Sequence, residues 1–178
     1  AMNRPRWHHG FTLVELLVTL GLIGLLTVLA FPAASRALRR ARTAACMSNL
    51  REIGRLVNDY TTARNGVLPT LYNRESRDDP RPAMDTVLLE GPHSVFRCPA
   101  DRRDLFSQTG TSYFWNYTVN SQAVDFVFSL AGGRNPDRIP LALDKEAFHP
   151  DTPDGVVTLY LTGRVGERLE FALSEVGR

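Results

Sequence analysis

The sequence predicts an α+β fold in which one long N-terminal helix packs on a small antiparallel sheet. An apolar run from Phe11 to Phe31 contains a single charged residue, and helical spacing of apolar residues continues beyond it. Segments rich in aromatic and β-branched residues, which are typical of strands, follow from residue 112 onward. The 178 residues leave room for one modest domain beside a membrane segment, and the net charge of +2 does not by itself indicate a nucleic-acid binder.

The apolar run is long enough to cross a membrane. Its 21 residues would span roughly 30 Å as a helix, the thickness of the hydrocarbon core of a bilayer. The alternative is a secretory signal peptide, with Arg4 and Arg6 as its basic start. However, the run is longer than the apolar part of most such peptides. It also contains Glu15, and placing a carboxylate at the centre of a bilayer costs about 2.5 kcal/mol or more, and less near its edge. We therefore expect a membrane helix in which the carboxylate has a function.

The segment from Gly10 to Leu16, with the sequence GFTLVEL, resembles the signal of prepilins and pseudopilins of the type IV pilin-like class. The resemblance implies that prepilin peptidase cuts after Gly10 and methylates the new terminal amine of Phe11. Residues 1–10 are then a leader peptide, in which Ala1 before the methionine is interpreted as an expression scar.

The same resemblance implies a function in assembly rather than catalysis. The chain would be a structural subunit of a type II secretion or type IV pilus-like filament. Its partners would be copies of itself, other pseudopilins, prepilin peptidase and an inner-membrane assembly platform. A buried carboxylate needs a partner, and Glu15 could pair with the Phe11 amine of a neighbouring subunit. Pro32, where many pilins also carry a proline, is expected to kink or locally melt the helix.

The resemblance also implies the location of the chain. It would be a single-pass protein of the bacterial inner membrane with its C-terminal domain in the periplasm, and later part of a filament. A count of basic residues favours the opposite orientation, because four arginines follow the apolar run closely: Arg36, Arg39, Arg40 and Arg42. These arginines are interpreted as a solvated or headgroup-facing surface, with DNA contact as the alternative.

The helix is expected to continue into the domain. Five residues recur at steps of four and three and so share one face: Cys46, Leu50, Ile53, Val57 and Tyr60. A stop is predicted at Asn65-Gly66. The predicted organisation is therefore a leader at 1–10, a transmembrane or filament-core helix at 11–31, its periplasmic continuation at 32–65 and a globular domain at 66–178.

Within the domain the sequence predicts short elements separated by loops. An exposed loop is expected from Tyr72 to Ala83, and residues 123–130 are ambiguous between strand and helix. Strands are predicted at 112–119, 139–143, 156–162 and 165–171, the last two forming a hairpin around Gly163.

Two cysteines are present, Cys46 and Cys98. A disulfide between them is favoured because the domain would lie in an oxidising periplasm, and two separate buried thiols are the alternative. Their spacing matches no zinc site, which normally has four ligands.

A polar stretch between two predicted strands contains oxygen ligands of the kind that calcium prefers. The candidates are Asp144, Asp151 and Asp154, and the alternative is a solvated loop without a metal. No other cofactor is expected. His149 with a neighbouring aspartate could be a catalytic pair, but no nucleophile motif accompanies it.

Two further functions stay open. One is a minor tip or DNA-uptake pilin that binds a substrate or DNA. The other is an extracytoplasmic binding domain on a plain membrane anchor.

Overall fold

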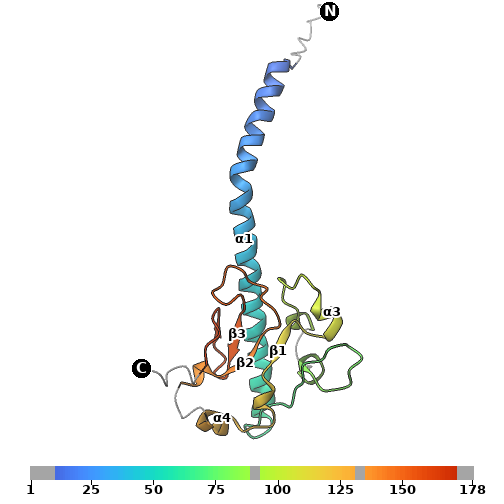
Figure 1. Cartoon of the computed structure of the whole chain (residues 1–178), viewed down its shortest axis with the longest axis vertical. Coiled ribbons are helices and arrows are strands. Elements are labelled where there is room, and N and C mark those ends of the chain that lie inside the picture. The colour runs from blue at the N-terminus through green and yellow to red at the C-terminus, as the bar shows by residue number, and fades with distance from the viewer. Residues whose placement is uncertain (1–10, 89–92, 131–134, 172–178) are drawn as a thin grey trace, which may run out of the picture. The chain divides into compact units, whose positions relative to one another are not determined.

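The computed structural model describes residues 11–88, 93–130 and 135–171 (Figure 1). The chain divides into two compact units, residues 1–38 and residues 39–178. The predicted fold class is confirmed, since the structure has a long N-terminal helix and a small antiparallel four-stranded sheet.

Helix α1 runs from Leu13 to Thr62 without interruption. Pro32 lies inside it, so the helix does not melt at this residue, and of the two expected effects a kink remains a prediction. Proline removes the donor to the carbonyl of Val28 and its ring crowds that carbonyl, but its fixed φ is close to that of a helix. The residues on both sides therefore continue the helix.

In the first unit, the apolar side chains of α1 have no cover from the residues that the structure describes. The large hydrophobic residues from Leu13 to Phe31 are each between 53% and 74% exposed. The helix is long and apolar enough to cross a membrane, a property that signal sequences near an N-terminus share. This surface requires lipid or other protein as its cover.

In the second unit, the remaining part of α1 forms one wall of the core. Cys46, Leu50 and Ile53 are fully buried, Val57 is nearly so, and Tyr60 packs at the margin. The predicted helical face is therefore confirmed. The chain turns after Thr62 through Asn65 and Gly66, with φ angles of 53° and 82°.

The sheet has four antiparallel strands in the order β1-β2-β3-β4, and Figure 1 shows β1 to β3 against α1. The strands are β1 (Tyr113–Trp115), β2 (Pro140–Asp144), β3 (Thr158–Tyr160) and β4 (Val165–Gly166). In the register Tyr113 is opposite Asp144, and Leu143 is opposite Thr158. The β3–β4 hairpin turns at Gly163, where φ is 82°, as predicted.

The predicted strand at 112–119 is wrong beyond Trp115. The side chain of Asn116 accepts a hydrogen bond from the Thr118 amide and donates one to the Pro140 carbonyl, which starts a short 3₁₀ turn. The ambiguous segment at 123–130 is helical. The short elements are α2 (Met84–Val87), η1 (His93–Phe96), α3 (Leu105–Thr109), η2 (Tyr117–Val119), α4 (Val124–Leu130) and η3 (Pro136–Arg138).

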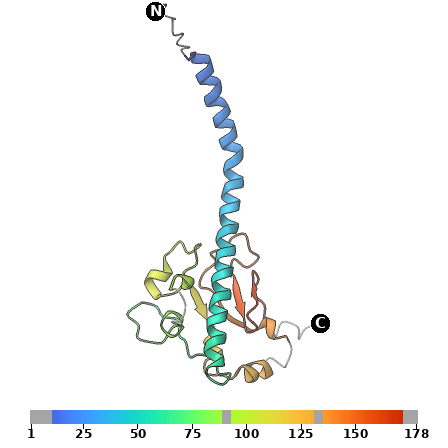
Figure 2. The same cartoon turned by 180° about the vertical axis from the view of Figure 1, so that it is seen from behind.

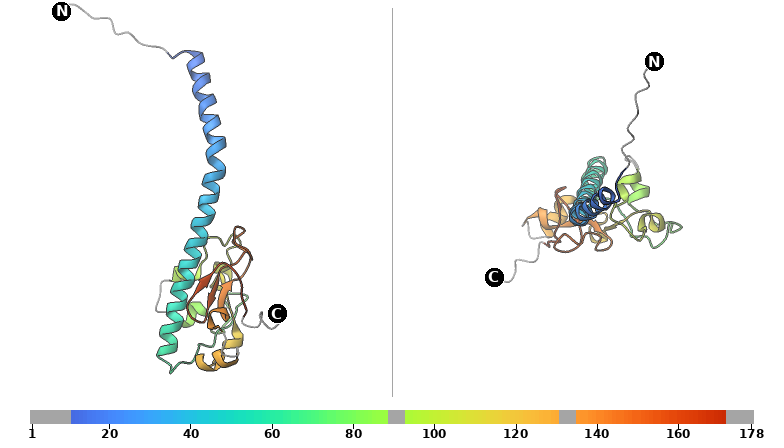
Figure 3. Two further views of the ribbon diagram at one scale, coloured as in Figure 1. Left: turned by 90° about the vertical axis from the view of Figure 1, so that its left-hand side faces the viewer. Right: turned by 90° about the horizontal axis from the view of Figure 1, so that it is seen from above.

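The sheet lies along one side of the second half of α1, as the back and side views show (Figures 2 and 3). Trp115, Tyr160 and Leu159 are fully buried in the second unit. A Cβ atom on Gly54 would lie 3.0 Å from Cδ1 of Leu159. The absence of a side chain at Gly54 therefore lets β3 approach the helix closely.

Candidate functional site

The start of α1 is organised by a reciprocal contact between Thr12 and Glu15. Oε2 of Glu15 accepts hydrogen bonds from the amide and the hydroxyl of Thr12, both at 2.9 Å. The Thr12 hydroxyl oxygen in turn accepts from the Glu15 amide at 3.2 Å. This is a capping box, which satisfies amides at a helix start that have no partner in the helix. The sequence analysis missed this local role, although Thr-x-x-Glu is its signature.

The capping box leaves part of the carboxylate unused. Both bonds end on Oε2, and Oε1 of Glu15 has no hydrogen-bond partner in the part of the chain that the structure describes. Phe11, just before the helix, is 80% exposed. Glu15 can therefore cap its own helix through Oε2 and still pair with a cation of another molecule through Oε1. Gly10, and with it the predicted cleavage site, lies outside the described residues.

A disulfide joins α1 to the segment after η1. The Sγ atoms of Cys46 and Cys98 are 2.01 Å apart, and both residues are fully buried. The structure therefore contains the pairing that the sequence analysis favoured over two separate thiols. The bridge joins residues 52 positions apart. In the chain-entropy model, closing a loop of this length raises the free energy of unfolding by about 4 kcal/mol.

His149 packs directly on this disulfide. Its Nε2 atom lies 3.4 Å from Sγ of Cys98 and 3.3 Å from Oδ2 of Asp144. Its Nδ1 atom lies 3.0 Å from the hydroxyl of Thr43 on α1. Because this hydroxyl donates its hydrogen to the carbonyl of Arg39, it accepts from Nδ1, which therefore carries a hydrogen. Nε2 is then the ring atom that faces the carboxylate and the sulfur.

Asp144, the last residue of β2, completes this buried group. Its Oδ2 accepts from the Val157 amide at 2.7 Å, while Oδ1 has no partner among the described residues. Burial raises the pKa of the Asp144 carboxyl, and the hydrogen bonds from His149 and Val157 act in the opposite direction. One proton between Nε2 and Oδ2 satisfies both atoms, so the pair holds the loop after β2 against α1.

The order Thr43–His149–Asp144 resembles the hydroxyl, imidazole and carboxylate of a hydrolytic triad. The geometry does not favour attack, because Thr43 is 7% exposed and its hydroxyl donates to a main-chain carbonyl. The cluster instead connects α1 to the end of β2 and to the loop that follows β2.

The three calcium candidates have separate protein partners. Asp144 contacts His149, Asp151 forms an ion pair with Arg39 at 2.8 Å, and Asp154 accepts from the Leu169 amide at 2.8 Å. These three residues therefore do not form a common set of oxygen ligands in the structure, and calcium binding by them remains a prediction. Among the described residues, the ligand atoms that do converge belong to Cys46, Cys98, Asp144 and His149, all within 4.8 Å of one another.

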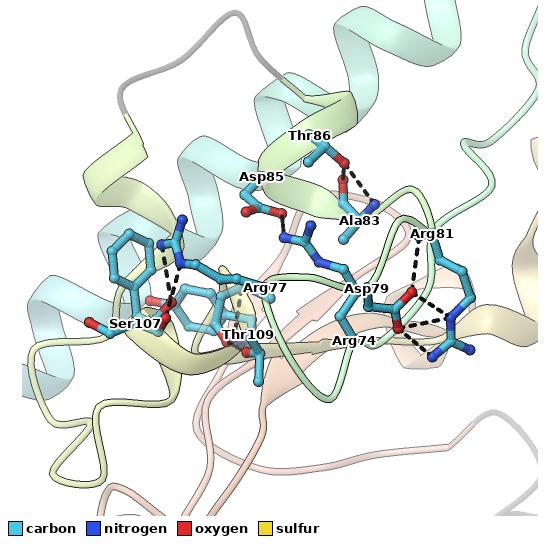
Figure 4. Close-up of polar contacts among 12 residues, drawn as sticks. Arg74, Arg77, Asp79, Arg81, Ala83, Asp85, Thr86, Ser107 and Thr109 are labelled. Carbon is cyan, nitrogen blue, oxygen red and sulfur yellow. Dashed lines mark hydrogen bonds and ion pairs between the residues drawn. The ribbon is translucent and has the colours of Figure 1, made fainter.

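A second buried polar group anchors the loop that was predicted to be exposed. Arg74 reaches inward from this loop and pairs with Asp85 of α2, and both side chains are less than a tenth exposed (Figure 4). Gly110 packs against this pair with a φ angle of 91°. The sequence analysis missed the pair because Arg74 lies in a run of charged residues that looks solvated throughout.

Lys145, the residue after β2, lies near this ion pair. Its Nζ atom donates to the hydroxyl of Thr109 at 2.5 Å. Burial, followed by the positive charge of Arg74, lowers the pKa of Lys145 from 10.5 to about 8.

Comparison with known proteins supports the interpretation of the N-terminal segment. The family model described as the prokaryotic N-terminal methylation motif matches residues 8–31. The chain thus carries this motif, consistent with a type IV pilin-like protein that has a prepilin signal. No curated protein and no solved structure matches the chain.

We predict that Gly110→Ala is much more destabilising than Gly163→Ala. Both glycines have positive φ angles, which cost an alanine about 1–2 kcal/mol. The new Cβ at residue 110 would lie 2.1 Å from Oδ2 of Asp85, whereas nothing lies within 4 Å at residue 163. Disruption of the buried Arg74–Asp85 pair should lower the free energy of unfolding of Gly110→Ala by about 3 kcal/mol more. Urea unfolding of both variants measures the difference, and equal losses would contradict the anchoring role.

The titration of Lys145 predicts how stability changes at alkaline pH. The folded chain loses this proton at about pH 8, whereas the unfolded chain keeps it up to about pH 10.5. Between these values the unfolded state binds more protons, so this residue raises the free energy of unfolding as pH increases. Lys145→Met should lack this rise. Urea unfolding of both chains across this pH range tests the expectation, and parallel curves would refute it.

Proposed function

We propose that the chain is a pseudopilin, a structural subunit of a type II secretion or type IV pilus-like filament, rather than an enzyme. The observation that carries this proposal is a carboxylate, Glu15, in the otherwise apolar first part of α1, which matches the methylation motif. Three features bear on it: the cover of the helix, the partner of the carboxylate and the location of the domain.

The exposed apolar surface of α1 favours a subunit that moves from lipid to protein. Leu13 to Phe31 present large hydrophobic side chains on all sides of the helix. Lipid covers such a surface before assembly, and the same segments of neighbouring subunits would cover it in a filament. A Cβ atom added to Gly21 or Gly24 would meet no heavy atom within 4 Å, so these positions are open to close approach of another helix.

Cleavage after Gly10 would create the partner that the carboxylate needs. The new amine on Phe11 keeps its positive charge when it carries a methyl group, as methylated lysine does. Oε1 of Glu15 has no hydrogen-bond partner among the described residues and could accept a hydrogen bond from this amine of an adjacent subunit. The pairing would fix the axial register and would exclude uncleaved subunits, which lack the amine.

We place the domain in the periplasm of a bacterium and α1 in its inner membrane before assembly. The buried Cys46–Cys98 disulfide supports this location, because such bonds persist in oxidising compartments. The partners would be prepilin peptidase, the assembly platform, other pseudopilins and copies of this chain.

We predict that the native chain begins with N-methylated Phe11. Intact-mass and N-terminal peptide mass spectrometry of protein from wild-type cells would show this residue and no leader. Substitution of Gly10 by valine should leave the leader attached. A native chain that keeps the leader would leave only the plain membrane anchor, and a cut well downstream would contradict the filament subunit.

We predict that Glu15→Gln blocks incorporation into filaments whereas Thr12→Val does not. Glutamine keeps the capping box but removes the charge, while valine at residue 12 breaks the box and keeps the charge. Losing a desolvated charge pair costs about 2 kcal/mol or more, which is about a thirtyfold loss of incorporation. Immunoblots of sheared filaments and of membranes measure both variants.

Normal incorporation of Glu15→Gln would contradict the proposed pairing and would favour a minor tip subunit. Failure of both variants, with both still processed and present in the membrane, would show that the helix cap rather than the charge is required. DNA binding that weakens with salt and disappears when Arg39, Arg40 and Arg42 are removed would favour DNA uptake.

A further inference from the structure

We propose that the reduced chain binds one Zn²⁺ ion through Cys46, Cys98, His149 and Asp144. Their ligand atoms lie within 4.8 Å of one another, and all four residues are buried. Sequence spacing could not indicate this site, because the cysteines lie 52 positions apart and the histidine comes 51 positions after Cys98. The inference does not depend on filament assembly.

The distances between the ligand atoms suit a tetrahedral ion. Zinc binds sulfur at about 2.3 Å and nitrogen or oxygen at about 2.0–2.2 Å, which places tetrahedral ligands about 3.3–3.8 Å apart. Nε2 of His149 already lies 3.4 Å from Sγ of Cys98 and 3.3 Å from Oδ2 of Asp144. The two sulfur atoms, bonded at 2.01 Å, must separate, and the remaining ligand atoms lie within 4.8 Å of one another.

The surroundings already hold the ligands in place. The Thr43 hydroxyl binds Nδ1 of His149, which leaves Nε2 as the atom that faces the cluster. Metal-binding histidines are commonly oriented in this way by a hydrogen bond to the other ring nitrogen. The Val157 amide likewise fixes the carboxylate of Asp144, whose buried Oδ1 has no partner among the described residues.

The donor set selects the metal. Two thiolates, an imidazole and a carboxylate form a set that favours zinc, whereas calcium and magnesium prefer oxygen ligands throughout. An ion would tie α1 to the segment around Cys98 just as the disulfide does. The domain would therefore keep a cross-link between the same two segments under both reducing and oxidising conditions.

The two forms interconvert by thiol–disulfide exchange. A dithiol reductant donates two electrons and two protons, so that the S–S bond becomes two thiols and the reductant becomes a disulfide. The two thiols release two protons as they bind the ion, and the proton shared by Nε2 of His149 and Oδ2 of Asp144 is released as well. The dithiol form is also that of the newly made chain before oxidation.

The test uses the full chain in detergent micelles. The protein is folded in its oxidised form, reduced anaerobically with a phosphine, and titrated with Co²⁺ and then Zn²⁺. We expect one ion per reduced chain, a thiolate-to-cobalt charge-transfer band, the visible spectrum of a tetrahedral site, and displacement of cobalt by zinc. The oxidised chain should show none of these signals. A reduced chain that binds no more cobalt than the oxidised chain would overturn the proposal.

Matched variants separate a built site from two accidental thiols. His149→Gln should weaken zinc binding more than about 100-fold, and Thr43→Val about 10–100-fold because it removes only the supporting hydrogen bond. His93→Gln, at an exposed histidine, should bind like the wild type. Zinc should also raise the melting temperature of the reduced wild-type chain. Equal zinc affinity in His149→Gln and the wild type would overturn the proposal, because the thiols alone would then bind the metal.

Discussion

The second half of α1 is the wall against which the domain is built, and most of the structure depends on this contact. Four strands of two to five residues do not enclose a core without a covering layer. Leu50 and Ile53 supply that layer, and Gly54 lets β3 approach it. The Cys46–Cys98 bridge ties the same face to the segment after η1. The helix that would enter the membrane is thus continuous with the one that organises the domain.

Long irregular segments cover the rest of the core, and buried polar pairs hold them. Arg74 pairs with Asp85, and His149 pairs with Asp144. A buried charge that loses its partner costs several kcal/mol, so each pair strongly disfavours displacement of its loop. Both pairs join segments that look like solvated polar stretches in the sequence.

Glu15 caps its own helix and could also make the proposed contact with a neighbouring subunit. Its Oε2 atom caps the helix of its own chain, while Oε1 has no hydrogen-bond partner among the described residues. The cap orders the start of α1 before any partner is present, and a preorganised carboxylate loses less entropy when it binds. A local helix signal and an assembly signal are therefore compatible in one side chain.

Features that depend on local pattern could be predicted from the amino-acid sequence alone. The spacing of apolar residues defined α1 and its buried face, and the segment from Gly10 to Leu16 identified the processing motif. Tertiary structure decided which polar residues meet. The contact between Thr43 and His149 joins residues 106 positions apart, and Arg74 is buried only because Asp85 and Gly110 surround it. No local pattern encodes such contacts, because they arise only when the chain packs against α1.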